Sequence, residues 1–252
     1  MSCRFPVLVA FMLCVGYSAL DVRLTAASQS SDSAIVAAVK RALSSHSDLR
    51  RLTVTASGSD VTLSGPVPTL ALKLEAVKRT LKVEGVKNVV SEIQLPRAES
   101  DQRLALFIGQ AVDRYPYQTL FDYIDAVILK GVIRLTGSVT GERNKAEEIA
   151  DEVARVRGVQ EIRNEIVTLP PSIGDDRIRA AIYDRLTASI HFDNVADMKN
   201  PPFRIVVHNG SVTLYGFVQG EIESRELEQL AKFTGGVLRV TNNLRTRTNP
   251  KR

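Results

Sequence analysis

The sequence of 252 residues is poor in the side chains on which most catalytic and covalent sites depend. It has no tryptophan, three histidines and two cysteines, and aromatic residues make up 6% of it. Because Cys3 and Cys14 both lie near the N-terminus, the rest of the chain has no thiol for a disulfide, a thiolate nucleophile or a zinc–thiolate site. His46, His191 and His208 are far apart and show no paired-ligand spacing.

Sequence motifs for catalysis are absent as well. The chain has no G-x-S-x-G, no P-loop and no G-x-G-x-x-G, so neither a serine nucleophile elbow nor a phosphate-binding loop is indicated. We therefore expect a protein that is not an enzyme and that uses no cofactor and no metal.

Only the N-terminus has a long apolar run. The run PVLVAFMLCVGYSAL follows the basic Arg4 and precedes the small residues of LTAAS, which is typical of a signal peptide, here over residues 1–28. A membrane anchor is an alternative, although the run is shorter than the ~20 residues that span a bilayer. A lipoprotein acylated at Cys14 is another, although Leu13 is a poor residue for the preceding position. We expect an exported protein, in the periplasm or peripheral on the envelope membrane.

The formal net charge of +5 is unevenly distributed along the chain. Residues 31–96 and 171–252 each carry +3, whereas residues 97–170 carry −2. Mild basicity in an exported protein fits anionic lipid headgroups or an acidic partner better than nucleic acid, which such a protein would rarely meet.

One short pattern occurs three times, as SDVTLSG (59–65), GVIRLTG (131–137) and GSVTLYG (210–216). A second set of glycines follows the closing glycines by 20 or 21 residues. A period near 75 residues is that of a small domain copied in tandem. We interpret these glycines as structural positions that need a positive φ or a close backbone approach, namely Gly65, Gly85, Gly137, Gly158, Gly216 and Gly236.

Each copy shows the same order of periodicities. A helical pattern with Asp32, Asp101 or Asp175 as the expected N-cap precedes two alternating runs that predict a β-hairpin. A second helix follows at about 69–83, 142–156 and 221–233, and then a third strand. In the first copy the expected apolar stripe of this helix consists of Leu70, Leu74, Val77 and Leu81. The sequence therefore predicts an α+β fold of three tandem αββαβ domains (31–96, 100–170 and 173–248), each a three-stranded mixed sheet packed on two helices.

This pattern resembles the BON domain, a family named for an osmotically inducible bacterial protein and nodulation proteins. The resemblance rests on a hydrophobic-x-Leu-x-Gly-x-Val hairpin motif and a Gly-Val-x-x-hydrophobic-x-Asn motif before the last strand. The first copy departs from it at Ser91, where the others have Asn164 and Asn242, and at Gly58, which comes one place early. The matching residues are Gly65, Val67 and Gly85; Gly137, Val139, Gly158 and Asn164; and Gly216, Val218, Gly236 and Asn242.

The resemblance implies a non-enzymatic module of bacterial envelope proteins. Such modules are regarded as binding phospholipids or other envelope components, and sometimes as protective factors in envelope stress. We therefore expect peripheral attachment to anionic phospholipid membranes and no nucleic-acid partner. The alternative is a periplasmic protein-interaction or chaperone-like scaffold that binds envelope proteins.

Two groups of side chains are candidates for binding a lipid or a partner. The segment RYPYQTLFDYID (114–125) holds four aromatic residues whose apolar bodies and polar tips suit a membrane interface, or packing against the neighbouring copy. The second helix of the first copy is basic and its equivalent in the second copy is acidic, so pairing of these two helices, within the chain or between chains, is an alternative use of their charges. The candidate binding residues are Arg103, Arg114, Tyr115, Tyr117, Phe121, Tyr123, Arg177, Arg179 and Arg185; the basic helix has Lys73, Lys78, Arg79 and Lys82, and the acidic one Glu142, Glu147, Glu148, Asp151 and Glu152.

Overall fold

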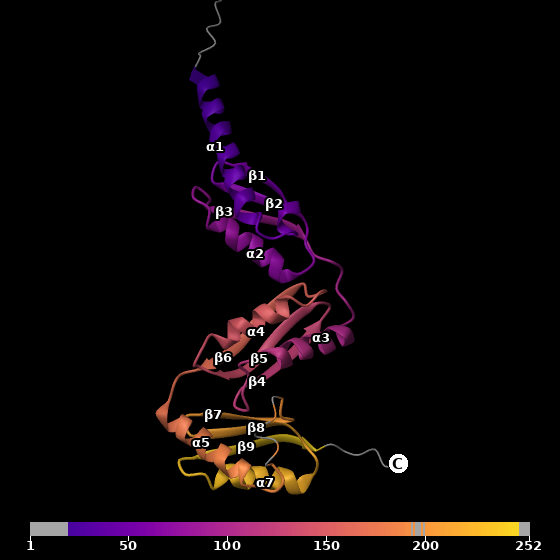
Figure 1. Cartoon of the computed structure of the whole chain (residues 1–252), viewed down its shortest axis with the longest axis vertical. Coiled ribbons are helices and arrows are strands. Elements are labelled where there is room, and N and C mark those ends of the chain that lie inside the picture. The colour runs from indigo at the N-terminus through magenta and orange to yellow at the C-terminus, as the bar shows by residue number, and fades with distance from the viewer. Residues whose placement is uncertain (1–19, 193, 195–197, 199, 247–252) are drawn as a thin grey trace, which may run out of the picture. The chain divides into compact units, whose positions relative to one another are not determined.

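The computed structural model describes residues 20–192, 194, 198 and 200–246, and its elements repeat in the predicted order. Most of the first repeat lies in one compact unit, and the second and third repeats lie in another. Figure 1 labels the helices and strands of all three repeats. The first repeat consists of α1 (Leu20–Leu43), a 3₁₀ turn η1 (Leu49–Arg51), β1 (Thr53–Ser57), β2 (Asp60–Pro66), α2 (Leu70–Leu81) and β3 (Asn88–Gln94). The second consists of α3 (Asp101–Arg114), β4 (Tyr123–Leu129), β5 (Val132–Thr140), α4 (Lys145–Ala154) and β6 (Glu161–Leu169). The third consists of α5 (Ile173–Thr187), β7 (Phe203–His208), β8 (Ser211–Val218), α7 (Glu221–Lys232) and β9 (Arg239–Thr246).

Each repeat contains one three-stranded sheet with the hairpin's second strand in the middle, in the orders β1-β2-β3, β4-β5-β6 and β7-β8-β9. The hairpin strands are antiparallel, and in the second and third repeats the last strand is parallel to the central one. The helix between the two parallel strands is the crossover connection that such a pair requires. The predicted fold class of three tandem αββαβ domains with mixed sheets is confirmed.

The hairpin turns differ between the repeats. Lys130 and Gly131, and likewise Asn209 and Gly210, have positive φ at both central positions, the pattern of a type I′ turn. In the first repeat only Gly58 does, with φ +60°, as in a type II′ turn. The first hairpin, whose glycine comes one position early in the sequence, therefore has a different two-residue turn from the equivalent hairpins of the other two repeats.

Three equivalent aspartates secure these turns, in a role that the sequence did not predict. Asp32 Oδ1 accepts a hydrogen bond from Gly58 N–H (2.9 Å), and Asp101 Oδ1 accepts one from Lys130 N–H (2.9 Å). Asp175 accepts from both Asn209 and Gly210 N–H, at 2.8 and 2.9 Å. The predicted N-caps are therefore wrong: α1 begins at Leu20, far before Asp32, and the aspartates face a distant turn instead. Serines cap the other two helices, Ser100 accepting from Arg103 N–H and Ser172 from Asp175 N–H.

The core of each repeat is formed by alternate residues of the hairpin and one stripe of each helix. In α4 the predicted face is confirmed, because Ala146, Ile149 and Val153 are buried. In α2 it is wrong in part. Leu70 is buried and Val77 is half-buried, but Leu74 and Leu81 are about half exposed, whereas Ala76 and Thr80 are fully buried. The exposed surface of α2 therefore includes Leu74 and Leu81, the two leucines of the predicted stripe that point away from the core.

The family's asparagine ties the last strand to the second helix. Asn164 Nδ2 donates to Ala146 O (3.0 Å), and Asn242 Nδ2 donates to Ser224 Oγ (3.2 Å). Ser91 holds this position in the first repeat, and its buried Oγ has no hydrogen-bond partner among the described residues. A side chain that is shorter by one amide group does not reach the helix.

Candidate functional site

Three of the four aromatic side chains in segment 114–125 are buried or half-buried, and Tyr117 is exposed. Tyr115 is 5% exposed and packs in the core of the second repeat, where its hydroxyl donates to Glu148 Oε2 (2.5 Å). Burial and the Glu148 carboxylate raise the pKa of Tyr115 well above its ordinary value. Tyr115 therefore cannot contact a lipid surface without a change of conformation. Tyr117 is 48% exposed, but the Arg143 guanidinium lies 3.6 Å from its ring centroid.

The next residues of this segment contact the third repeat. Leu120 is buried in that repeat's core and Phe121 packs against it, while Leu120 O accepts a hydrogen bond from Ile205 N–H (2.9 Å). The Tyr123 ring stacks on the Tyr215 ring, with centroids 3.8 Å apart. Burial raises the pKa of Tyr123. The sequence predicted either a membrane interface or packing against the neighbouring copy for this segment, and Phe121 and Tyr123 are found packed against the neighbouring copy.

A buried ionic network fixes the path of this segment. Asp122 is fully buried, and its Oδ2 accepts from Thr119 N–H (2.7 Å) and from Lys145 Nζ (2.8 Å). Its Oδ1 accepts from Thr140 N–H (2.8 Å) and Oγ1 (3.1 Å). Because a buried charge needs such partners, Asp122 and Lys145 together position Leu120 toward the third repeat. The carboxylate oxygens of Asp122 are thus satisfied by groups of the protein itself.

The predicted cations divide into exposed and buried residues. Arg103 and Arg114 are exposed on α3, with Arg103 3.5 Å from Glu99 and Arg114 Nε donating to Gln110 O (3.0 Å). Arg177 and Arg185 are exposed on α5. Arg179 is 8% exposed because its guanidinium donates to Val207 O (2.8 Å) and pairs with Asp176, so it does not face solvent as a lipid ligand would.

Some charged side chains of the basic helix α2 and the acidic helix α4 already have partners within their own repeats. Arg79 donates to Ala42 O and to Ser45 in the first repeat. In the second repeat Glu148 pairs with Arg143, at 2.8 Å from its Nη2. Pairing between the basic and the acidic helix stays a prediction.

The six repeated glycines have positive φ, between 88° and 125°. The need is sharpest at Gly137, where an added Cβ would lie 2.0 Å from Tyr123 O on the paired strand. At Gly236 the close neighbour is a side chain instead of the backbone, since an added Cβ would lie 3.3 Å from Ile178 on α5. These glycines shape the backbone of the repeat.

The sequence did not reveal an exposed apolar cluster at one end of the third repeat. Asp175, near the start of α5, accepts a hydrogen bond from the hairpin turn at Asn209 N–H. The loop after α7 lies against the same helix at Gly236, beside Ile178, and Leu238 N–H donates to Gly210 O of the hairpin turn (2.8 Å). Ile173, Phe233 and Leu238 are therefore at the same end, and they are 74%, 68% and 82% exposed.

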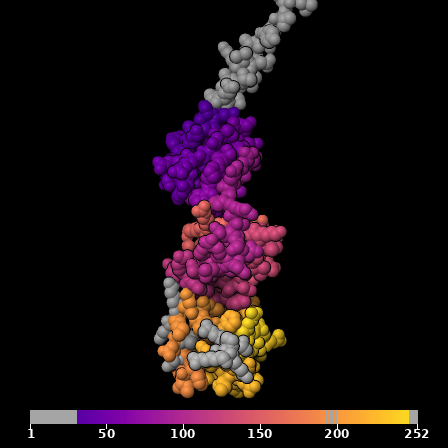
Figure 2. All heavy atoms as spheres, turned by 90° about the vertical axis from the view of Figure 1, so that its right-hand side faces the viewer, coloured from indigo at the N-terminus to yellow at the C-terminus, as the bar shows by residue number. Residues whose placement is uncertain are grey.

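Cations accompany these apolar side chains. Arg177 follows Ile173 by one helical turn, Lys232 precedes Phe233 and Arg239 follows Leu238, and all three are exposed. We call this set the third-repeat tip: Ile173, Arg177, Lys232, Phe233, Leu238 and Arg239. It belongs to the orange-to-yellow part of the surface in Figure 2.

Comparing the copies would have indicated the tip. The positions of Ile173, Phe233 and Leu238 are held by Glu99, Arg155 and Gln160 in the second repeat, and by Ser30, Lys82 and Lys87 in the first. The fold therefore does not require apolar residues there, and large exposed apolar groups that the fold does not need indicate an interaction site.

The described residues contain neither a metal-binding cluster nor a membrane-spanning helix. No group of three or more histidine, cysteine, aspartate or glutamate side chains in that part of the chain is arranged to hold a metal ion. Within the same residues, no helix combines the length and the apolar composition needed to cross a membrane.

The match to one protein family agrees with the repeated architecture. The sequence profile of the BON domain matches residues 31–97, 101–170 and 174–248. No curated protein matches the sequence significantly. Among solved structures, the C-terminal domain of CdsD, a structural protein of the type III secretion system of Chlamydia trachomatis, is 14% identical with a TM-score of 0.23, covering 83% of this chain and 96% of its own. The periplasmic domain of the type III secretion inner-membrane protein PrgH from S. typhimurium is also 14% identical, with a TM-score of 0.20 and coverage of 78% and 100%.

Proposed function

Because the chain belongs to the BON domain family, we propose that it is an envelope-associated binding protein that attaches peripherally to anionic phospholipid membranes through the third-repeat tip. Three exposed apolar side chains beside three exposed cations are the observation that carries the proposal. Each cation near an anionic leaflet contributes about 1 kcal/mol. An apolar side chain that moves fully out of water contributes about 1.5–3 kcal/mol.

The local charge supports an anionic surface. Asp175 is buried at the hairpin turn, and Asp176, although exposed, forms an ion pair with Arg179. Arg177 and Arg239 have no ion pair among the described residues, so their charge is available to a lipid headgroup. Apolar side chains flanked by such cations are arranged as in proteins that lie on a membrane interface.

The proposal is tested by vesicle flotation of residues 29–252 with phosphatidylglycerol-rich and pure phosphatidylcholine vesicles over a salt series. We expect the chain to float with the anionic vesicles at low salt and to remain in the dense fraction as salt screens the attraction. Changing Phe233→Ser with Leu238→Gln, or Arg177→Glu with Arg239→Glu, should abolish flotation. Leu106→Gln on α3 is the matched control, because Leu106 is 59% exposed but lies outside the tip.

Two outcomes would overturn the assignment. If Arg103→Glu with Arg114→Glu abolishes flotation and the tip variants do not, the lipid surface lies on the second repeat. If the chain stays in the dense fraction with every vesicle, membrane attachment is refuted and the scaffold alternative takes its place.

A further inference from the structure

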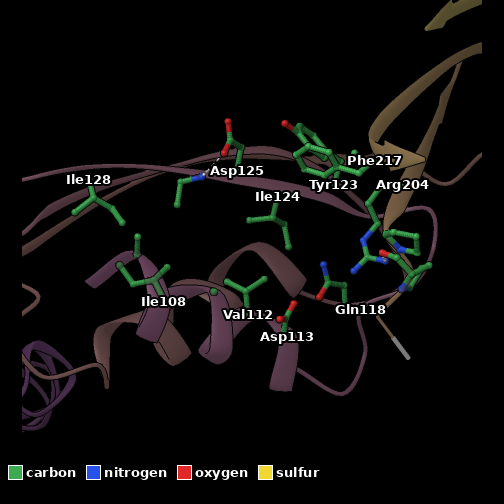
Figure 3. A pocket seen from close by; sticks show the side chains of 16 residues that line it. Ile108, Val112, Asp113, Gln118, Tyr123, Ile124, Asp125, Ile128, Arg204 and Phe217 are labelled. Atoms are coloured by element: carbon green, nitrogen blue, oxygen red, sulfur yellow. Dashed lines mark hydrogen bonds between the residues drawn. The ribbon is translucent and has the colours of Figure 1, made fainter. Parts of the chain in front are cut away.

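A groove of about 360 Å³ lies between α3 and β4 of the second repeat (Figure 3). Its walls are apolar along Ile108 and Val112 on the helix and along Ile124 and Ile128 on the strand. β4 is an edge strand, paired with β5 on one side only. Helix and edge strand thus form an apolar channel, and residues of the third repeat, among them Pro202, Arg204 and Phe217, line one end of it. No strand among the described residues pairs with the outer edge of β4.

The same groove is closed in the third repeat. Arg179 and Tyr183 on α5 are large, and Arg179 Nη2 reaches across to Val207 O (2.8 Å). Ala105 and Gly109 hold the equivalent positions on α3, so nothing from the helix fills the groove. The strand residues reflect this difference: Phe203, Ile205 and Val207 are buried, whereas Ile124, Ala126 and Ile128 are half-buried.

A peptide segment completes the closed groove. Leu120 inserts its side chain into the core of the third repeat, and its carbonyl accepts from Ile205 N–H at the outer edge of β7. The equivalent donor on β4 is Ala126 N–H, because Ala126 pairs with Leu135 as Ile205 pairs with Leu214. Ala126 N–H is bound by the neighbouring Asp125 side chain (2.9 Å), not by a strand.

Two polar groups at the end of the open groove lack partners that a peptide would supply. Gln118 Oε1 is buried and accepts no hydrogen bond from the described residues. The Arg204 guanidinium points toward Gln118 and Asp113 (Figure 3), and it donates to Pro201 O (3.1 Å). Within the part of the chain that the structure describes, no carboxylate lies within ion-pair distance of Arg204. Its burial lowers the pKa, which Asp113 and Asp122 oppose.

We propose that the α3–β4 groove binds an extended peptide of a partner protein as an added strand, with apolar side chains at alternate positions and an acidic group at Arg204. A peptide carbonyl replaces Asp125 on Ala126 N–H, and a peptide N–H satisfies Gln118 Oε1. Strand addition at a sheet edge is a common mode of peptide recognition. An acyl chain would fit the apolar walls but would satisfy neither backbone-type group. The proposal is independent of lipid attachment by the third-repeat tip.

The test is an NMR titration of ¹⁵N-labelled residues 29–252 with a seven-residue peptide that alternates leucine and threonine and ends in a glutamate with a free carboxylate. We expect saturable shifts of the Ala126 amide and the Gln118 side-chain amide, with a Kd of about 100 µM because the contact is small. Gly109→Tyr and Ala105→Arg, which install residues of the third repeat, should each weaken binding by about tenfold or more.

Two controls separate the groove from the fold. An added Cβ at Gly109 meets nothing within 4 Å, so Gly109→Tyr should fold, and Gln110→Tyr places the same side chain on an exposed neighbouring position. Arg204→Gln should raise the Kd for the peptide with the free carboxylate about tenfold, and it should not change the Kd for the same peptide ending in a carboxamide.

The proposal is overturned if the peptide shifts neither amide, or if Gly109→Tyr binds it as well as Gln110→Tyr does. It is also overturned if monomeric lysophosphatidylglycerol shifts both amides and the peptide does not, because the groove would then be an acyl-chain site.

Discussion

Replacing Asp122 with asparagine should destabilise the second repeat strongly. The carboxylate is fully buried and accepts hydrogen bonds from Thr119, Thr140 and Lys145. In asparagine an NH₂ group replaces one carboxylate oxygen, so N–H groups would face the N–H donors that Asp122 now accepts from. The Lys145 ammonium, whose side chain is 3% exposed, would also lose its paired carboxylate. Breaking a buried pair in this way costs about 3–5 kcal/mol. We expect the lower end, because Lys145 Nζ also lies 3.3 Å from Glu142 and 2.6 Å from Thr140 Oγ1.

This cost can be read as a thermal shift. The second and third repeats share one compact unit, and for a unit of roughly 170 residues 1 kcal/mol corresponds to about 2–4 °C. A loss of ~3 kcal/mol should therefore lower the Tm by about 6–12 °C. Far-UV circular dichroism follows unfolding, and near-UV dichroism reports on tyrosines, since the chain has no tryptophan.

The matched controls make the result decisive. Asp151→Asn changes an exposed carboxylate of the same repeat and should alter stability by less than about 0.5 kcal/mol. Combining Asp122→Asn with Lys145→Met removes both buried charges, so the double variant should be more stable than the sum of the single losses predicts. The reasoning from the buried pair is refuted if Asp122→Asn has the same Tm as Asp151→Asn. It is also refuted if the loss of stability in the double variant equals the sum of the losses from Asp122→Asn and Lys145→Met.

Three further predictions concern the repeated positions. Gly137→Ala should cost more than about 2 kcal/mol in urea unfolding, because the φ is positive and the new methyl meets Tyr123 O on the paired strand; a cost no larger than an exposed strand Gly→Ala change would contradict it. Burial alone would raise the pKa of Asp175, but the N–H groups at the hairpin turn hold it below its ordinary value. Its contribution to stability should therefore be complete above about pH 5 and be lost as the pH falls through the folded-state pKa, and a stability difference from Asp175→Asn that does not shrink in acid would argue against this. Ser91→Asn should stabilise the first repeat by about 0.5–1.5 kcal/mol in urea unfolding, because the longer amide reaches the second helix as Asn164 does; no gain would show that the strand sits too far from the helix.

Much of the fold follows from local rules that the sequence states three times. Apolar residues at a period of two or 3.6 define the strands and helices, and positive-φ glycines mark the turns and the ends of helices. Both signals depend on neighbours within a few residues, so they need no knowledge of the rest of the chain. The α2 face was misjudged because spacing shows which side chains align, but not which face the sheet covers.

The sites depended on contacts between distant segments. Asp175 resembles an N-cap in sequence, yet its carboxylate binds a turn more than thirty residues away. Tyr115 and Arg179 carry groups suited to a surface, but packing buries both. The apolar tip and the open α3–β4 groove arise from side chains of three or four separate elements, so only the tertiary structure could bring them together. Periodicity fixes which residues share a face, whereas burial is settled by what the folded chain places against that face.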